Sequence, residues 1–143
     1  MVITPHMLVG AAVGIHSNNI GMAFLFGLIS HYIVDLLPHW EYMDQISISS
    51  KKDFLKIFLD FIIGSLIVLI LVWDYPGRMA IGFAIIGSLL PDILLFLDSR
   101  FKSKFLKYHR EYHHKIHYFK YLSFWQGLPA TMVVIVVSLM LII

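Results

Sequence analysis

The chain has 143 residues, of which 59% are hydrophobic and 14% are charged, with a formal net charge of +2 and no cysteine. Its mean hydropathy of +0.79 lies above the range of ordinary soluble domains. The absence of cysteine excludes disulfides, thiolate metal ligands and cysteine nucleophiles. Because there is no internal repeat or low-complexity linker, we expect one helical domain, embedded in a membrane, over residues 1–143.

Apolar segments in chain order predict an all-α membrane bundle of about four to five membrane-embedded helices plus an amphipathic surface helix. The first segment begins at Thr4, which can cap it, and is too short to cross a bilayer core of about 30 Å. Within it, Gly10 and Gly14 form a pair that lets two helix backbones approach closely. Pro38 ends the second segment because proline lacks a backbone N–H donor. The segments cover 4–15, 20–37, 53–73, 79–97, the amphipathic 98–120, and 121–143.

Lysine and arginine concentrate in two of the connections and indicate the orientation in a membrane. The 98–120 segment carries seven of them and the 40–56 connection three, whereas the 74–78 turn has one. Basic residues are retained on the cytoplasmic side. We therefore expect a multi-pass protein of the cell (plasma or inner) membrane, with both long connections and the N-terminus facing the cytoplasm.

Histidine and aspartate side chains gather at the cytoplasmic ends of these predicted helices. The stretch "SHYIVDLLPHW", residues 30–40, places three of them within about two helical turns. His31 and Asp35, at i and i+4, share one helix face and can reach one ion. Neutral imidazole and carboxylate are donors that suit zinc, manganese or iron. The predicted metal ligands are His6, His31, Asp35, His39, Asp60, Asp92, His113, His114 and His117.

The number of donors predicts a site for one to two divalent ions, most plainly two zinc ions. Counting two of the three late histidines, these residues give eight donors, which exceed the roughly four that one tetrahedral ion uses. Asp60 and Asp92 are single charges inside apolar runs. Each costs about 3 kcal/mol to insert unless an ion or a partner offsets that cost.

The same residues have structural explanations that the sequence leaves open. His31 and Asp35 can form a hydrogen bond at a helix end, and Asp60 can pair with Lys56 one turn away. Asp92 can satisfy backbone groups freed by the proline before it. Each explanation makes the residue part of the fold rather than of a metal site.

The late histidines are the hardest to assign, because an amphipathic interfacial helix can contain any of them without a role in metal binding. His113 and His117, one turn apart, are the favoured ligands, followed by His114, and His109 stays open. Four further acids are expected to be solvated charges of loops or helices: Glu41, Asp44, Asp98 and Glu111. For Glu111, a role in orienting a metal ligand stays open.

Five short motifs together resemble the YdjM-like family of membrane-bound metal-dependent hydrolases. They are "TPHMLVG", "SHYIVDLLPHW", Asp60, "GSLLPD" and "HHKIH", and they extend over most of the chain. The resemblance implies a helical membrane hydrolase with metal ligands in these motifs, and leaves open which late histidine is a ligand. The His-x-x-x-Asp at 31–35 is also similar to the metal-binding element of helical zinc phospholipase C and S1/P1 nucleases, which suggests phosphoester chemistry.

These features predict metal-assisted hydrolysis at the cytoplasmic membrane surface, on a phosphoester of a lipid or another anionic amphiphile. A divalent ion would activate water, and Asp35 or Asp60 would accept its proton. The expected partners are membrane lipids and a lipid or small-molecule substrate, and no nucleic acid. The alternatives are a non-enzymatic membrane protein that binds or transports a metal ion or proton, and a structural protein with an incidental histidine cluster.

Overall fold

The computed structural model describes residues 2–40, 50–101, 103–116 and 122–143, and within these ranges the chain is helical, with no strand. The predicted all-α class is therefore confirmed. The helices are α1 (Ile3–Ile15), α2 (Ile20–Asp35), α3 (Lys51–Leu71), α4 (Arg78–Arg100), α5 (Lys104–Ile116) and α6 (Phe124–Ile142).

Three of these helices, α3, α4 and α6, are long and apolar enough to cross a membrane, with 21, 23 and 19 residues. This is fewer than the four to five membrane-embedded helices expected from the sequence. The difference lies in α1 and α2, which have 13 and 16 residues. At 1.5 Å per residue they reach about 20 and 24 Å, which is less than the roughly 30 Å of a bilayer core.

The helix boundaries follow local signals, with one correction at the start of α1. Asn19 caps α2 by accepting hydrogen bonds from two backbone N–H groups, and Ser50 caps α3 by accepting one from the N–H of Asp53. Thr4, expected to cap the first helix, instead lies inside it, because the N-cap position is Val2. The end of the fourth segment also moves: α4 continues through Pro91 to Arg100, into the range expected to begin the surface helix.

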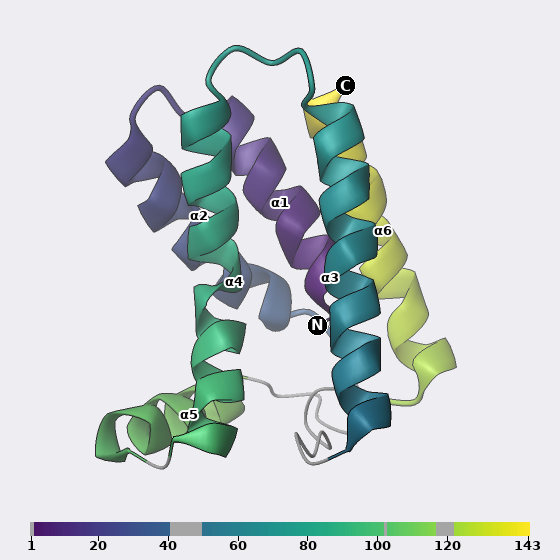
Figure 1. Ribbon diagram of the computed structural model, residues 1–143. Helices are drawn as coiled ribbons and strands as arrows, with labels where there is room; N and C mark the ends of the chain where they lie inside the picture. Colours follow the sequence, from purple (N-terminus) through teal and green to yellow (C-terminus); the bar gives the residue numbers. More distant parts are fainter. Residues whose placement is uncertain (1, 41–49, 102, 117–121) are drawn as a thin grey trace.

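The short helix α1 lies at the centre of the bundle, where it contacts α2, α3, α4 and α6 (Figure 1). Its glycines allow a close approach to α4. A methyl group added at Gly10 would meet the Cα of Ile85 at 2.9 Å, and one added at Gly14 would collide with the backbone of Ile81. The close backbone approach predicted for this glycine pair is therefore confirmed, and its partner is α4.

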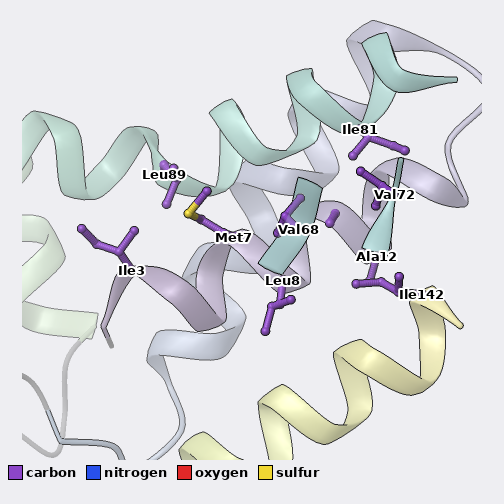
Figure 2. Packing of buried hydrophobic residues seen from close by; sticks show 10 residues of the cluster. Ile3, Met7, Leu8, Ala12, Val68, Val72, Ile81, Leu89 and Ile142 are labelled. Atoms are coloured by element: carbon purple, nitrogen blue, oxygen red, sulfur yellow. The ribbon is translucent and has the colours of Figure 1, made fainter. Parts of the chain in front are cut away.

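The apolar core is built around α1 and reaches α3, α4 and α6 (Figure 2). Met7 and Leu8 are 4% and 1% exposed, and they belong to one cluster with Val68 of α3, Leu89 of α4 and Ile142 of α6. This core holds α1 in a fixed register against α4. It thereby positions the polar residues at the lower end of Figure 1, where α1 begins and α2 ends.

The outer face of α3 is apolar and exposed. The helix buries Gly64 and Val68, whereas the side chains of Phe58, Leu66 and Ile70 are 49%, 54% and 76% exposed. A helix this apolar and this exposed is compatible with lipid contact rather than contact with water.

Candidate metal site

Four buried side chains from three helices meet where α2 ends. His31 and Asp35 come from α2, Asp92 from α4 and His113 from α5, and each offers a nitrogen or oxygen atom within 4.8 Å of the others'. All four are at most 4% exposed. A group of this composition could hold a metal ion, because imidazole and carboxylate are the donors of borderline divalent ions.

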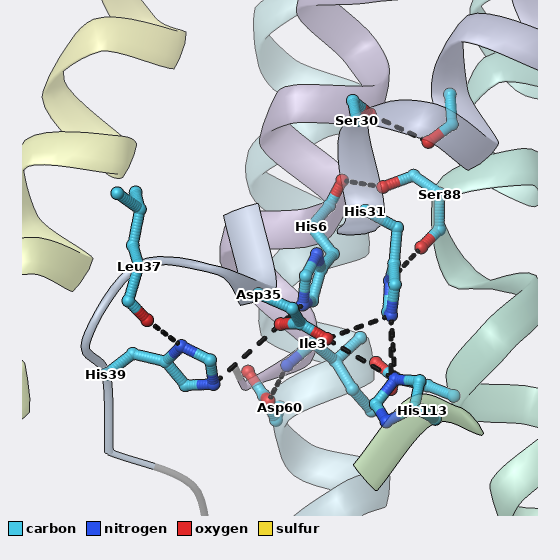
Figure 3. A network of polar contacts seen from close by, with 12 residues as sticks. Ile3, His6, Ser30, His31, Asp35, Leu37, His39, Asp60, Ser88 and His113 are labelled. Atoms are coloured by element: carbon cyan, nitrogen blue, oxygen red, sulfur yellow. Dashed lines mark hydrogen bonds and ion pairs between the residues drawn. The ribbon is translucent and has the colours of Figure 1, made fainter. Parts of the chain in front are cut away.

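The nitrogen and oxygen atoms of these four side chains lie close together. His31 Nε2 lies 3.1 Å from Asp35 Oδ2, 3.2 Å from His113 Nε2 and 3.8 Å from Asp92 Oδ1. His113 Nε2 lies 3.4 Å from Asp35 Oδ2 and 3.9 Å from Asp92 Oδ1. Figure 3 shows the side chains of His31, Asp35 and His113 pointing toward one another.

The tautomer of His31 is set by the backbone of α4. Its Nδ1 lies 2.7 Å from the carbonyl oxygen of Ser88. A carbonyl only accepts hydrogen bonds, so His31 Nδ1–H must donate, and in the neutral ring Nε2 then carries a lone pair. That lone pair faces Asp35, whose ionised carboxylate also only accepts. The centre of the group therefore needs a positive charge, either a proton or a metal ion.

Two further imidazoles face the same carboxylate from its other side. His6 of α1 places Nε2 3.1 Å from Asp35 Oδ1, and its ring stacks on His31 with centroids 4.2 Å apart. His39, in the segment after α2, places Nε2 3.7 Å from the same oxygen. His39 Nδ1 donates to the carbonyl oxygen of Leu37 at 2.7 Å. Asp35 is thus surrounded by four histidines.

The four-donor group fits a metal ion on two grounds. Donors held about 2.0–2.2 Å from a tetrahedral ion lie roughly 3.3–3.6 Å apart. The contacts of the two histidines within the group, at 3.1–3.9 Å, include this range. Asp92 supplies the second ground, because it is 4% exposed and neither carboxylate oxygen makes a hydrogen bond to the described residues. A buried carboxylate in that state is costly unless a cation compensates it.

The buried state of Asp92 also bears on the structural explanation left open by the sequence. A carboxylate that satisfied backbone groups freed by Pro91 would accept hydrogen bonds from them. Among the residues that the structure describes, it accepts none. The contacts of Asp92 are instead the two histidines of the group, at 3.8 and 3.9 Å.

Asp60 has a different setting from the other predicted ligands. Its carboxylate accepts hydrogen bonds from the backbone N–H of Ile3 at 2.7 Å, the N–H of Thr4 at 3.3 Å and the hydroxyl of Thr4 at 2.6 Å. It thus caps the first turn of α1, a place where a negative charge is favoured. Lys56, considered as its partner, lies 3.3 Å from Asp53. A catalytic or metal-binding role for Asp60 stays a prediction.

The late histidines separate according to the face of α5. His113 is 1% exposed and joins the four-donor group, whereas His114 is half-buried one residue later. His117 lies outside the described residues. His113 is thus the late histidine that lies in the four-donor group, on the α5 helix that contacts the end of α4 (Figure 1). Its role as a metal ligand stays a prediction.

His109 is a residue that the sequence argument left unassigned and that the structure brings next to the site. Its ring centroid lies 5.8 Å from that of His113, one turn away. Neither ring nitrogen has a hydrogen bond to the described residues. Burial, followed by the nearby charge of His113, lowers the pKa of His109, which favours its neutral form. Its i, i+4 spacing from His113 was the available sequence signal.

The helix α5 is fixed to α4 by an ion pair. Asp98, expected to be a solvated charge, is 4% exposed, and its Oδ2 accepts a hydrogen bond from Arg110 at 2.5 Å. Leu106 is also buried on this face of α5. The expectation for Asp98 is therefore wrong, because α4 extends three residues further than predicted and places Asp98 beneath α5. This contact holds His113 over the site.

Comparison of the chain with protein-family models, with curated proteins and with solved structures finds no match. The description of this protein therefore rests on its fold and on the four-donor group alone. The chain is an all-α protein with three helices long and apolar enough to cross a membrane, and it has a buried His/Asp group that could hold a metal ion.

Proposed function

We propose that this chain is a membrane-bound metal-dependent hydrolase, as the YdjM-like resemblance implies, and that it cleaves a phosphoester of a lipid or another anionic amphiphile. The observation that carries the proposal is the buried group of His31, Asp35, Asp92 and His113, with donors within 4.8 Å of one another. Two carboxylates and two imidazoles fit zinc, and also manganese or iron.

In this proposal, each residue of the group has a stated role. His31 and His113 provide nitrogen donors, and Asp35 and Asp92 provide oxygens that neutralise the charge of a divalent ion. A divalent ion in such a site polarises phosphoryl oxygens and lowers the pKa of bound water. With one ion on Asp35 Oδ2, Oδ1 is the carboxylate oxygen placed to accept a proton, since Asp60 already accepts three hydrogen bonds at α1.

An apolar groove beside the site supports a lipid substrate. A cavity of about 210 Å³ between α3, α4 and the start of α1 is lined by Phe58 and Phe61 of α3 and by Leu89 and Ile93 of α4, among other apolar side chains. Among the described residues, Asp92 is the charged residue of this lining, and it also belongs to the four-donor group. Its carboxylate oxygens are buried behind the apolar wall, so the groove ends beside the group rather than opening into it. A hydrocarbon chain in this groove would place its polar end next to the metal group.

The distribution of buried polar side chains favours hydrolysis over transport. A transport path needs polar groups along the depth of the membrane. Among the described residues, the buried polar side chains gather at one end of the bundle, except Ser138 of α6. The hydroxyl of Ser138 donates to the carbonyl of Val134 in its own helix. We therefore place the site on one face of the membrane, and the basic residues of α5 favour the cytoplasmic face.

The test of the metal group is elemental analysis of the purified chain in detergent. We expect at least one equivalent of zinc, manganese or iron per chain, lost in His31→Ala and in Asp92→Asn. His16→Ala is the matched control, because His16 is exposed at the other end of the bundle and contacts Leu141. Absence of metal from the wild-type chain, even after incubation with excess zinc, would contradict the proposal.

The test of the activity uses the metal-loaded chain and phosphatidylglycerol in mixed micelles, with release of the headgroup or phosphate as the readout. We expect turnover that disappears with chelator and in Asp92→Asn. Ile93→Trp should fill the groove and reduce turnover of long-chain lipid, with metal content unchanged. Ile86→Trp is its control, since Ile86 is a similarly exposed isoleucine of α4 outside the groove. Equal turnover by both tryptophan variants would exclude the groove from substrate binding.

A further inference from the structure

The carboxylate of Asp35 has a histidine pair on each of its two oxygens. Oδ2 faces His31 at 3.1 Å and His113 at 3.4 Å, and this side belongs to the four-donor group. Oδ1 faces His6 at 3.1 Å and His39 at 3.7 Å. The second pair comes from different segments, α1 and the residues after α2, so its position does not follow from that of the first (Figure 3).

The ring of His6 has no hydrogen bond that would explain why it is buried. It is 0% exposed, and neither Nδ1 nor Nε2 makes a hydrogen bond to the described residues, although Nε2 lies 3.1 Å from Asp35 Oδ1. A buried polar group left in this way destabilises the fold unless a partner compensates it. The backbone of His6 is held in place, since its carbonyl accepts a hydrogen bond from the Ser88 hydroxyl at 2.7 Å. The His6 ring is thus held at a position where a bound cation would provide a partner for its Nε2 atom.

His39 shows the arrangement that is usual for a metal-ligating imidazole. Its Nδ1–H donates to the carbonyl of Leu37 at 2.7 Å, which leaves a lone pair on Nε2. That lone pair faces Asp35 Oδ1 at 3.7 Å. Two acceptors this close repel each other unless a positive charge lies between them, as on the Oδ2 side. His39 is 5% exposed, so water does not screen the repulsion.

We infer that Asp35 bridges two cation positions, and that His6, His39 and Asp35 Oδ1 form a second site for a divalent ion such as zinc. The inference rests on the proposed metal group at Asp35 Oδ2 and deepens it. Three protein donors leave a fourth position of a tetrahedral ion open, which is the pattern of catalytic zinc sites. With both ions bound, Asp35 becomes a positioning residue rather than the proton acceptor.

The charge balance of two ions indicates what the centre recognises. Asp35 and Asp92 together contribute two negative charges, and two divalent ions contribute four positive ones. The occupied centre therefore carries an excess of two positive charges in a buried place, which an anion must compensate. A phosphoester or inorganic phosphate provides that compensation, whereas a neutral ester does not. Phosphate should therefore strengthen binding of the second ion.

The experiment is a zinc titration of the chelator-stripped, full-length chain in detergent, with zinc per chain measured after removal of unbound ion. We expect two equivalents for the wild type and for the His16→Ala control, and one equivalent for His39→Ala. His39 lies outside the helices, so its loss should leave the fold intact. His6→Ala, in the core of α1, should also hold one equivalent, and His39→Asn serves as a second variant at position 39. Inorganic phosphate should lower the concentration of zinc that half-saturates the second position.

A spectroscopic measurement shows whether the two ions share a ligand. Loading with Mn²⁺ should give an exchange-coupled pair in the electron paramagnetic resonance spectrum of the wild type, and a single uncoupled ion in His39→Ala. One equivalent in the wild type would overturn the second site and leave the proposed function standing. No metal at all would overturn both. Two equivalents retained in both His39→Ala and His6→Ala would place the second ion elsewhere and overturn this inference.

Discussion

At the scale of single residues, the decisive contrast is between Asp60 and Asp92. Both are acids within helices long enough to cross a membrane. Asp60 accepts hydrogen bonds from the first turn of α1, whereas Asp92 is buried without a hydrogen bond among the described residues. The sequence could not separate them, because each appears as one charge in an apolar run. The distinction depends on contacts between residues 56 and 57 positions apart.

Asp60→Asn tests this contrast. The amide keeps one acceptor oxygen but loses the negative charge at the start of α1, so we expect a loss of about 1–3 kcal/mol in stability. Metal content should be unchanged. The unfolding midpoint in detergent and elemental analysis measure the two effects. Asp53→Asn is the control, since Asp53 pairs with a Lys56 side chain that is 63% exposed and should change stability by about 1 kcal/mol or less. Loss of metal in Asp60→Asn would show that Asp60 is a ligand.

At the scale of helices, glycines set the distances on which the site depends. Gly27 of α2 and Gly87 of α4 lie against the backbone of the opposite helix, at Ala84 and Phe24. The α2–α4 contact is thereby close enough to bring His31 and Asp35 of one helix to Asp92 of the other. A bulkier residue at either position would push the two helices apart and open the metal group.

Gly87→Ala should therefore lower both stability and metal affinity. Its methyl group would collide with the carbonyl oxygen of Phe24 and lie 3.0 Å from the backbone nitrogen of Leu28. Backbone atoms cannot rotate away, so α2 must shift, at a cost of about 1–3 kcal/mol. Gly82→Ala on the same helix meets nothing within 4 Å and should stabilise α4 by up to about 1 kcal/mol. The unfolding midpoints of both variants, measured in the same detergent, test this difference in stability. Equal midpoints for Gly87→Ala and Gly82→Ala would contradict the prediction.

The sequence predicted the helices better than the contacts between them. Apolar runs are local signals, so the boundaries of the apolar helices agree within a few residues, although the one predicted cap, Thr4, was wrong. The glycine pair of α1 predicted a close contact but could not name α4 as the partner. The extension of α4 to Arg100 was missed because residues 98–100 are polar, yet Asp98 is buried by α5. Such tertiary contacts override local polarity.

At the scale of the whole molecule, the bundle has two chemically different ends. Among the described residues, the end with α5 (Figure 1) carries the lysines and every histidine except His16, whereas the α3–α4 turn at the other end has few polar residues. From the sequence, this asymmetry alone predicted that the distant histidines would meet, because it fixed which helix ends share a face. It could not show which pairs face which oxygen of Asp35.

Cysteine labelling tests the orientation in the membrane. The chain has no cysteine, so single replacements give an unambiguous signal. Asp74→Cys, exposed in the α3–α4 turn, should react with a membrane-impermeant maleimide in intact cells. Ser99→Cys, exposed at the other end of α4, should react only after the cells are permeabilised. The unaltered chain is the blank. The reverse pattern would place the metal group on the outer face.

The scattering of the donors along the chain also has a consequence for biogenesis. His31 and His113 are 82 positions apart, so α5 is synthesised after both α2 and α4. The four-donor group is complete only once α5 has been made, so an ion bound as proposed would arrive after Asp35 and Asp92 are already part of the chain. Because ion binding joins α5 to helices already in place, it should act as the final step that commits the newly made protein to its mature form.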